Sequence, residues 1–261
     1  MRRHLRLLRI FIANSLQLEL EYRLNLAMNA LNAVLTFAVG LVVLYVLFQQ
    51  AGSVGGWSFE EALALFGVFL FFEGIIDLFL YPNLSKLPEA IRTGALDFML
   101  LKPVSVQFLV SFRYASLWQV PELFIGLGLI AYSMAALDRL TAASALLGLV
   151  FLLCGAVVLY AVWFMLTTTA FWFVKVENVP ELFHSIFAAG RFPISAFPPW
   201  IRLLLTFVVP VAFITSVPAE AAVGRLDWTT GAQAVAAAVV AFAASRAFWR
   251  LALRGYTSAS S

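Results

Sequence analysis

The chain has 261 residues, of which 63% are hydrophobic and only 12% are charged, and its formal net charge is +3. Soluble domains have about 45–50% apolar and about 25% charged residues, so this composition excludes an ordinary soluble domain and indicates an integral membrane protein. The basic residues lie beside the ends of hydrophobic runs, which excludes a nucleic-acid-binding face, and the single cysteine, Cys154, excludes an intrachain disulfide.

The first 23 residues predict an amphipathic helix at the cytoplasmic face of the membrane. Arg2, Arg6 and Arg9 share one side of this helix, and leucine and isoleucine residues share another. A secretory signal peptide is excluded because Arg6 and Arg9 interrupt its apolar core. An arginine-rich organelle transit peptide is the alternative for this segment.

Hydrophobic runs of the length that crosses a membrane predict an all-α protein with six transmembrane helices. The predicted spans are 26–48, 62–81, 106–136, 142–173, 180–196 and 231–251. The third is longer than a bilayer requires, so its first turns are expected to project into the cytoplasm. A competing choice places the fifth span at 201–221, which leaves the number of crossings unchanged.

Residues 197–223 are apolar but repeatedly interrupted by proline, which breaks a helix and frees a carbonyl group. Because a freed carbonyl in lipid must find a partner within the protein, we expect broken helices that re-enter the membrane from the outer side. The residues that mark this outer segment are Pro193, Pro198, Pro199, Trp200, Pro210 and Pro218.

The distribution of Lys and Arg predicts that both termini are cytoplasmic, because cytoplasmic loops carry an excess of these residues. With the N-terminus inside, the outer turns hold only Arg139 and Arg225, and Arg191 and Arg202 depend on how the fifth span is placed. The inner segments hold Arg2, Arg3, Arg6, Arg9, Arg23, Lys86, Arg92, Lys102, Arg113, Lys175, Arg246, Arg250 and Arg254.

The sequence contains no pattern typical of an enzyme. It has no Gly-x-x-x-x-Gly-Lys-Ser/Thr phosphate loop, so we expect it to bind no ATP itself. It has no His-Glu-x-x-His and no Gly-x-Ser-x-Gly, and its two histidines are His4 and His184. We therefore expect no catalytic residues, no metal and no cofactor on this chain.

Three carboxylic acids lie within predicted spans. Glu73 and Asp77 are four residues apart and share a helix face, and Glu122 follows a proline in the third span. Ionisable groups at membrane depth usually face a protein interior or water, so these residues are candidates for lining a substrate or proton path. The plainer interpretation is that Asp77 lies near the inner interface and Glu73 makes a structural hydrogen bond.

The insert between the second and third spans, residues 84–102, has a helical pattern of its own. Leu84, Leu87 and Ile91 recur at helical spacing with polar residues between them, and Gly94 is placed to end the helix. Two interpretations are open. This helix lies on the membrane surface, or it is a coupling helix that docks in a groove of a soluble partner.

The stretch from Arg92 to Pro103 resembles a pattern in ABC-2 type ABC transporter permeases, R-x-G-x-L-D-x-x-L-x-K-P. Arg92, Gly94, Leu96, Asp97, Leu100, Lys102 and Pro103 match it. The proline-rich stretch 192–202 with the prolines that follow, and the C-terminal stretch 254–260, are also similar to this family. The resemblance covers essentially the whole chain and is closest to the compact six-span branch.

The resemblance implies a permease subunit of an ATP-driven exporter in the cell membrane. Two permease copies, identical or homologous, would assemble with two cytoplasmic ATPase subunits that bind ATP and Mg²⁺. The resemblance implies that the insert and a second loop contact the ATPase, through Leu84, Leu87, Ile91, Arg92, Gly94, Leu96, Asp97, Leu100, Lys102, Lys175 and Glu177. The alternatives are an ATP-independent ion-coupled transporter or channel that uses Glu73 and Asp77, and a membrane enzyme that acts on lipid.

Overall fold

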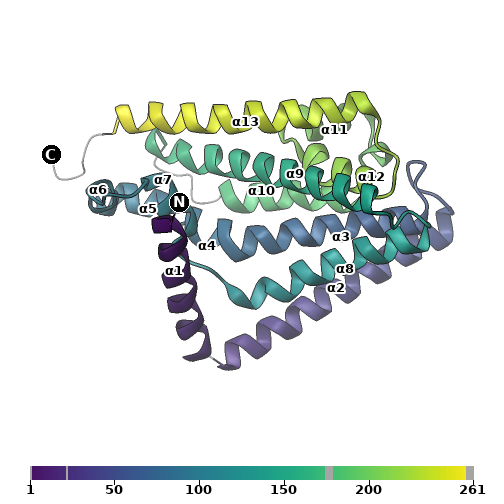
Figure 1. Ribbon diagram of the computed structural model, residues 1–261, viewed down its shortest axis with the longest axis horizontal. Helices are drawn as coiled ribbons and strands as arrows, with labels where there is room; N and C mark the ends of the chain where they lie inside the picture. The colour runs from purple at the N-terminus through teal and green to yellow at the C-terminus, as the bar shows by residue number, and fades with distance from the viewer. Residues whose placement is uncertain (1, 22, 174–178, 257–261) are drawn as a thin grey trace.

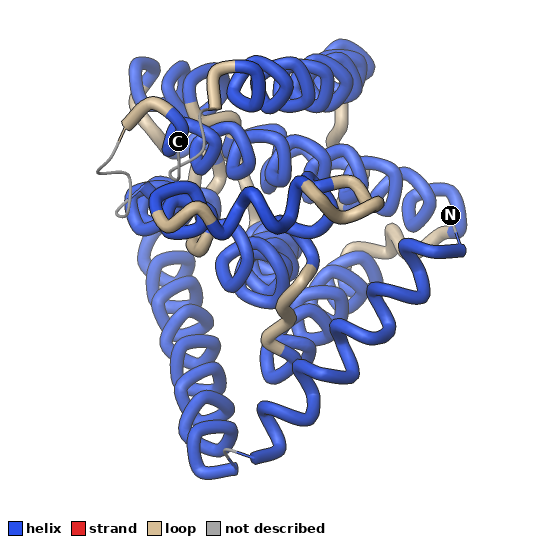
Figure 2. Tube along the Cα trace, turned by 90° about the vertical axis from the view of Figure 1, so that its left-hand side faces the viewer, coloured by secondary structure: helices blue, strands red, loops and turns tan. Residues whose placement is uncertain are grey.

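A computed structural model describes residues 2–21, 23–173 and 179–256. All regular structure in these ranges is helical, apart from one isolated bridge between Val54 and Trp57 (Figure 2). The longer helices are α1 (Arg2–Glu21), α2 (Arg23–Ala51), α3 (Phe59–Ile75), α8 (Val120–Ala136), α9 (Ala142–Thr168) and α13 (Trp228–Arg254). The shorter α-helices are α4 (Tyr81–Leu84), α5 (Leu87–Arg92), α6 (Ala95–Leu100), α7 (Val106–Phe112), α10 (Val179–Phe187), α11 (Pro199–Leu203) and α12 (Val217–Ala222).

Five helical runs are long and apolar enough to cross a membrane, and a bent pair of helices gives a sixth if it is one span. The five runs are Ala33–Ala51, Phe59–Arg92, Leu117–Ala136, Ala142–Phe171 and Trp228–Arg254. The prediction of an all-helical protein with several membrane spans is therefore confirmed. The expected fifth span at 180–196 is not among these runs, because α10 is followed there only by two short 3₁₀ turns, Ala188–Arg191 and Ile194–Ala196.

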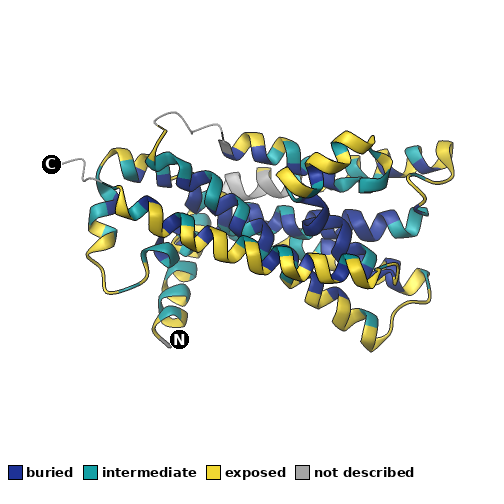
Figure 3. Ribbon diagram, turned by 90° about the horizontal axis from the view of Figure 1, so that it is seen from above, coloured by how far each residue is buried: buried dark blue, intermediate teal, exposed yellow. Residues whose placement is uncertain are grey.

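Helix α3 occupies the centre of the bundle, and the other long helices surround it (Figures 1 and 3). It packs closely on α8 because both helices have glycine at the crossing point. A Cβ atom added to Gly67 would lie 2.7 Å from the carbonyl oxygen of Gly126, and one added to Gly126 would lie 2.6 Å from the oxygen of Gly67. The outer faces of α2 and α13 carry exposed apolar side chains, as expected of surfaces that face lipid.

Helix α3 continues through a π-helical turn, Ile76–Leu80, into α4 and α5. Together they form one apolar run, Phe59–Arg92, with a short turn at Ser85 and Lys86. The segment predicted as a separate helix, residues 84–102, is therefore divided between the end of this run and α6. A turn at Gly94, which adopts a left-handed conformation with φ of 73°, separates the two parts.

The third predicted span, 106–136, is wrong as a single helix, because the chain is non-helical from Arg113 to Ser116. The backbone groups freed at this break are paired with distant segments, as membrane-embedded breaks require. The side chain of Asn83 donates to the carbonyl of Tyr114 at 2.7 Å and accepts from its N–H at 2.8 Å. Two side chains of α1 accept from the next amides: Ser15 from Ala115 at 3.1 Å and Glu19 from Leu117 at 2.7 Å.

These bonds attach α1 across the end of the bundle, where it runs crosswise to the long helices (Figure 1). His4 adds an edge-on ring contact to Phe108 of α7, with ring centres 4.8 Å apart. Several large apolar residues of α1 remain exposed, among them Leu5, Leu18 and Leu20. A crosswise helix with an exposed apolar side is the geometry expected of an interfacial helix.

Residues 179–196 run along α3 from one end of the bundle to the other, although they do not form one long helix. Glu181 accepts a hydrogen bond from Tyr81 at one end, and the ring of Phe187 stacks on Phe69 further along, at 5.2 Å. At the other end the hydroxyl of Ser195 donates to the carbonyl of Gly55 at 2.7 Å. The conformation changes from α-helix to 3₁₀ turn after Phe187 and becomes extended at Phe192.

The bent pair follows directly and consists of Pro199–Val208 and Ala212–Ala222, which meet at an angle of 80°. Both of its ends lie against the loop that joins α2 to α3. Ser195, just before the pair, bonds to Gly55, and Arg225, just after it, donates to the carbonyl of Gly56 at 2.9 Å. Arg225 also forms an ion pair of 2.5 Å with Glu61, so the segment begins and ends at the same end of the bundle.

Candidate functional site

The insert that follows the central helix forms two short helices, α5 and α6, at the same end of the bundle as the start of α1 and the end of α13 (Figure 1). Gly94 ends the turn after α5, as predicted, because its left-handed backbone is strained for any residue with a side chain. The hydroxyl of Thr93 donates to the carbonyl of Glu89 at 2.8 Å and closes the last turn of α5.

The apolar residues predicted to contact a partner through the insert face the protein instead. Leu84, Leu87 and Leu96 are 0%, 1% and 0% exposed, respectively, and belong to the main hydrophobic core. Ile91 is half-buried against the same core. These residues therefore hold the insert onto the bundle, and they are not available for direct contact in this conformation.

A different set of side chains is exposed on the insert. Phe98 is 73% exposed and Leu101 is 81% exposed, and Leu100, Arg92 and Lys102 are exposed beside them. Large apolar residues that are this exposed at a polar end of a membrane protein indicate a contact surface. We call Phe98, Leu100 and Leu101 the α6 apolar face.

Asp97, the acidic residue of the matched pattern, connects the insert to the C-terminal end of α13. Its carboxylate interacts with the hydroxyl of Tyr256, and partial burial together with this carboxylate raises the pKa of the phenol. The ring of Tyr256 also packs edge-on against Phe171, with ring centres 5.5 Å apart. Tyr256 thus lies between Asp97 of the insert and Phe171, which are far apart in the sequence.

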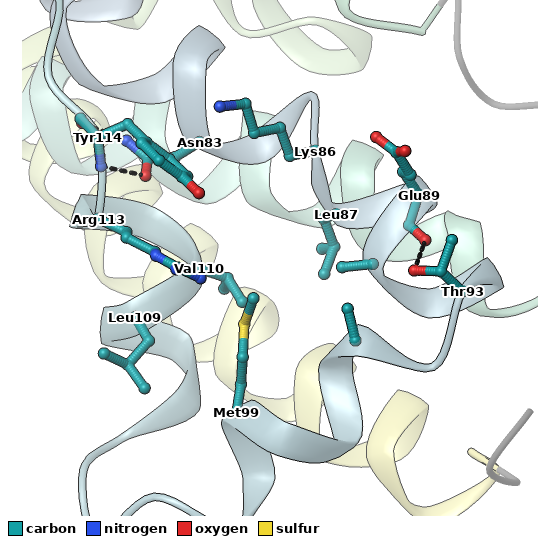
Figure 4. Close-up of a pocket in the computed structure, with 12 residues that line it drawn as sticks. Asn83, Lys86, Leu87, Glu89, Thr93, Met99, Leu109, Val110, Arg113 and Tyr114 are labelled. Carbon is teal, nitrogen blue, oxygen red and sulfur yellow. Dashed lines mark hydrogen bonds between the residues drawn. The ribbon is translucent and has the colours of Figure 1, made fainter. Parts of the chain in front are cut away.

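A cavity of about 240 Å³ lies between the insert and α7 (Figure 4). Its apolar wall consists of side chains such as Leu87, Met99 and Leu109, and Lys86 and Arg113 line it as well. The ammonium group of Lys86 lies 3.6 Å from the centre of the Tyr114 ring. The cavity therefore combines an apolar wall with two positive charges.

The second predicted contact loop, with Lys175 and Glu177, lies outside the described residues.

The residues predicted to mark the outer segment lie partly just before the bent pair and partly within it. Pro198 and Pro199 begin α11, Pro210 lies at the bend and Pro218 lies in the first turn of α12. Trp200 is 68% exposed, and Pro193 is buried just before the pair.

The three acids predicted to line a path come together near the π-helical turn. Glu73 and Asp77 are neighbours on the central helix, and both act electrostatically on Glu122 of α8. Asp77 lies at the centre of this group. Its two carboxylate oxygens contact His184 Nε2 at 3.3 Å and Gln119 Nε2 at 2.8 Å.

His184 and Gln119 were not predicted as members of this site. The only sequence signal for His184 is its position three residues after Glu181, which places both residues on one face of a helix. Gln119 is 4% exposed, and its amide oxygen has no hydrogen-bond partner among the described residues. The indole N–H of Trp163, whose ring lies 5.4 Å from that of His184, is likewise without a described partner.

Comparison with known proteins identifies one family. The family described as ABC-2 family transporter protein matches residues 34–260, which leaves residues 1–33 and 261 outside the match. No curated protein matches the chain. The matched range includes the insert, the acidic group around Asp77 and the bent pair.

Proposed function

This chain belongs to the ABC-2 transporter family, and from that premise we propose that it is the membrane-spanning permease subunit of an ATP-driven exporter. The family and the apolar helices make it a multi-pass membrane transport component. In our proposal, separate cytoplasmic ATPase subunits bind and hydrolyse ATP, and a second permease, identical or homologous, completes the transport path.

The observation that carries this proposal is the α6 apolar face. Phe98 and Leu101 project from the end of the bundle with nothing from the described residues to cover them. A soluble partner that docks there buries this surface, and apolar burial contributes about 25 cal/mol per Å². Arg92 and Lys102 are exposed on the same insert and provide charged contacts at the edge.

The arrangement of the central helix suggests how a displacement of the insert by the ATPase is transmitted to the transport path. Helices α3, α4 and α5 form one run, so a displacement of α5 is transmitted along a rigid element. The π-helical turn at Ile76–Leu80 lies between the insert and Glu73. Such turns are typical of functional sites, because they place one extra residue in the helix.

We further propose that the bent pair is a re-entrant hairpin that closes the outer end of the path. Its two ends meet the same loop, and the chain bends at the half-buried Pro210, next to the buried Val211. Gly190 packs beside this bend, where an added Cβ atom would lie 2.8 Å from Val211. The ion pair between Arg225 and Glu61 secures the outer end.

The proposed orientation places both termini and the insert in the cytoplasm of a cell with this protein in its inner or plasma membrane. The positive residues support it, because Lys86, Arg92 and Lys102 belong to the insert and Arg113 directly follows α7. The crosswise helix α1 lies at the same end, where its arginines meet anionic lipid.

A second candidate function is favoured by the acidic group. Glu73, Asp77 and Glu122 lie together with His184, and such chains of ionisable groups are typical of proton-coupled transporters. In this alternative the chain works without an ATPase. It predicts transport in liposomes that contain only this protein and that responds to a pH gradient.

Purification of the tagged chain from its native host in a mild detergent, followed by mass spectrometry, tests the proposal. The expected result is recovery of a cytoplasmic ATPase with a Walker phosphate loop. A variant with Phe98→Ser and Leu101→Ser should lose this ATPase, whereas Phe207→Ser, an equally exposed residue of the bent pair, should retain it. Reproducible recovery of the intact membrane protein without any ATPase would contradict the proposal and favour the ion path.

A further inference from the structure

Two adjoining cavities lie at the end of the bundle that carries the insert, on either side of Arg113. The first, of about 240 Å³, lies between the insert and α7, and Lys86 contributes to its lining (Figure 4). The second, of about 300 Å³, lies between α7 and the crosswise helix α1, and Lys102 contributes to its lining. Arg113 and Tyr114 line both cavities, so the two form one continuous site.

The charge of this site is positive and uncompensated. Lys86, Lys102 and Arg113 are exposed, and none of them forms an ion pair with a carboxylate of the described residues. Glu89 is the one acidic residue among the described residues that line either cavity. The site therefore has three positive charges and one negative charge, and a bound anion would balance the excess positive charge.

The positions of two of these cations strengthen the argument. The ammonium group of Lys86 lies 3.6 Å from the centre of the Tyr114 ring, and the guanidinium of Arg113 lies 5.3 Å from the same centre. Both positive charges are thus held at one aromatic ring. Their mutual repulsion is relieved when an anion binds between them.

Most of the remaining wall is apolar and continues onto the exposed apolar side of α1, with polar groups added by Asn14, Ser15, Asn83 and Thr93. Met99 and Leu109 line both cavities, and Phe11 and Leu18 of α1 extend the second one. Leu18 is 58% exposed, so its outer side faces the surroundings of the bundle. A ligand that fits has an anionic group for the cations and an aliphatic part for this apolar wall.

We propose that this site binds the phosphate headgroup of an anionic phospholipid from the leaflet in which α1 lies, with its acyl chains along α1. Lys86, Lys102 and Arg113 are the headgroup-binding residues. Basic pockets between transmembrane helices at the cytoplasmic side are typical sites for such lipids. The assignment to the inner leaflet rests on the orientation in the proposed function, whereas the binding itself does not.

A membrane lipid fits this site better than an acidic segment of a soluble partner. Helix α1 lies crosswise at this end with exposed apolar residues, which acyl chains cover and a soluble loop does not. A neighbouring groove on α1, lined by Arg6, Arg9 and the apolar residues Leu5 and Ile10, has the same combination of charges and apolar groups. The bound lipid therefore connects the insert to the membrane surface.

Lipid binding to the purified full chain in a neutral detergent tests this proposal. Phosphatidylglycerol and phosphatidylcholine are titrated separately, and retained lipid is counted by native mass spectrometry. We expect phosphatidylglycerol to bind at least tenfold more tightly. The double variant Lys86→Gln, Arg113→Gln should weaken phosphatidylglycerol binding about 30-fold, since each basic residue near the surface contributes about 1 kcal/mol.

The matched control is Arg250→Gln, which removes an exposed cation of α13 that lines neither cavity. It should bind phosphatidylglycerol as the unmodified chain does. Equal binding of the two lipids, or equal weakening by Arg250→Gln, would overturn the proposal. So would displacement of phosphatidylglycerol by millimolar inorganic phosphate, which would identify a site for a free anion.

The single variant Lys86→Gln keeps the test valid if the double variant fails to fold, because Lys86 is exposed and its removal leaves the Asn83–Tyr114 bonds intact. It should weaken phosphatidylglycerol binding about fivefold. None of these measurements requires an ATPase. A loss of lipid binding is therefore distinguishable from a failure of the proposed function, which the ATPase recovery experiment detects.

Discussion

His184 and Asp77 join two segments that are distant in the sequence, with 3.3 Å between Nε2 of the imidazole and Oδ1 of the carboxylate. Asp77 belongs to the π-helical turn of the central run, and His184 belongs to α10, which packs along it. The other carboxylate oxygen accepts from Gln119 at 2.8 Å, so one side chain connects three elements of the bundle. We infer that this contact fixes the position of α10 against the central helix.

A double-mutant cycle measures this contact. Asp77→Asn and His184→Gln should each lower the free energy of unfolding in detergent, and their combination should lower it by about 0.5–3 kcal/mol less than the sum, because both remove the same interaction. The control pairs His184→Gln with Asp227→Asn, which weakens the N-terminal cap of α13, shares no partner with the imidazole and should give additive losses. Additive losses for Asp77 and His184 would show that the contact contributes nothing.

The close crossing of α3 and α8 gives a second prediction. An added Cβ atom at Gly126 would lie 2.7 Å from the backbone nitrogen of Phe71, so Gly126→Ala must push the two helices apart. Overpacking of this kind lowers the free energy of unfolding by about 1–3 kcal/mol. Gly128 is in the same helix, and an added Cβ atom there would meet nothing within 4 Å. Gly128→Ala should therefore leave the melting temperature unchanged or slightly raised, and equal effects of the two variants would contradict the close packing.

Local features of this fold could be predicted from the sequence. Gly94 ends its turn because a left-handed residue is needed there, and Glu61 caps the start of α3 together with Ser58, as expected of acids at a helix entrance. Both depend on neighbours within a few residues. The spacing of Leu84 and Leu87 also predicted that both residues lie on helices. The spacing does not indicate what covers their apolar face, and in this structure the bundle itself covers it.

Features that depend on distant partners could not be predicted. The break at Arg113–Ser116 exists because Asn83, Ser15 and Glu19 provide hydrogen bonds to it, and these residues are 31, 100 and 98 positions away from their partners. No local signal in 106–136 marks it. His184 joins the acidic group for the same reason, since its partner Asp77 lies on a different segment.

Asp97 is the residue of the insert for which we expect the largest functional effect. Asp97→Lys replaces the carboxylate that acts electrostatically on Tyr256 with a positive charge, so we expect it to weaken the association of the insert with the end of α13. With the ATPase present, ATPase activity coupled to transport should fall at least tenfold, while the amount of protein inserted in the membrane stays the same. Asp97→Asn preserves the shape and a hydrogen-bond acceptor, so it should retain most of the activity.

Tyr256→Phe tests whether Asp97 acts through this contact. It removes the hydroxyl that the carboxylate meets but keeps the ring that packs on Phe171. We expect a smaller loss of coupled activity in the same direction. Full coupling in Asp97→Lys would remove the insert from the mechanism, and full coupling in Tyr256→Phe alone would show that Asp97 does not act through the Tyr256 hydroxyl.

Glu19 attaches α1 to the break before η2 (Leu117–Gln119), and its effect depends on pH. Burial raises the pKa of its carboxyl above the ordinary value of 4.5, although hydrogen bonds from the Leu117 and Trp118 amides act in the opposite direction. The folded state therefore binds this proton more tightly than the unfolded state. Consequently, the contribution of Glu19 to stability improves as the pH falls through the raised pKa, and it stops changing below about 4.5.

Glu19→Gln should remove this pH dependence, because the amide keeps an acceptor for the Leu117 N–H without a charge to bury. At pH 7 its melting temperature should equal or exceed that of the unmodified chain, and the difference should shrink on acidification. Glu19→Ala leaves that N–H unpaired and should lower the free energy of unfolding by about 1–3 kcal/mol. Glu21→Gln, an exposed acid of the same helix, should follow the unmodified chain at every pH. A melting temperature of Glu19→Gln that falls below the unmodified chain at pH 7 would mean that the charge itself stabilises this contact.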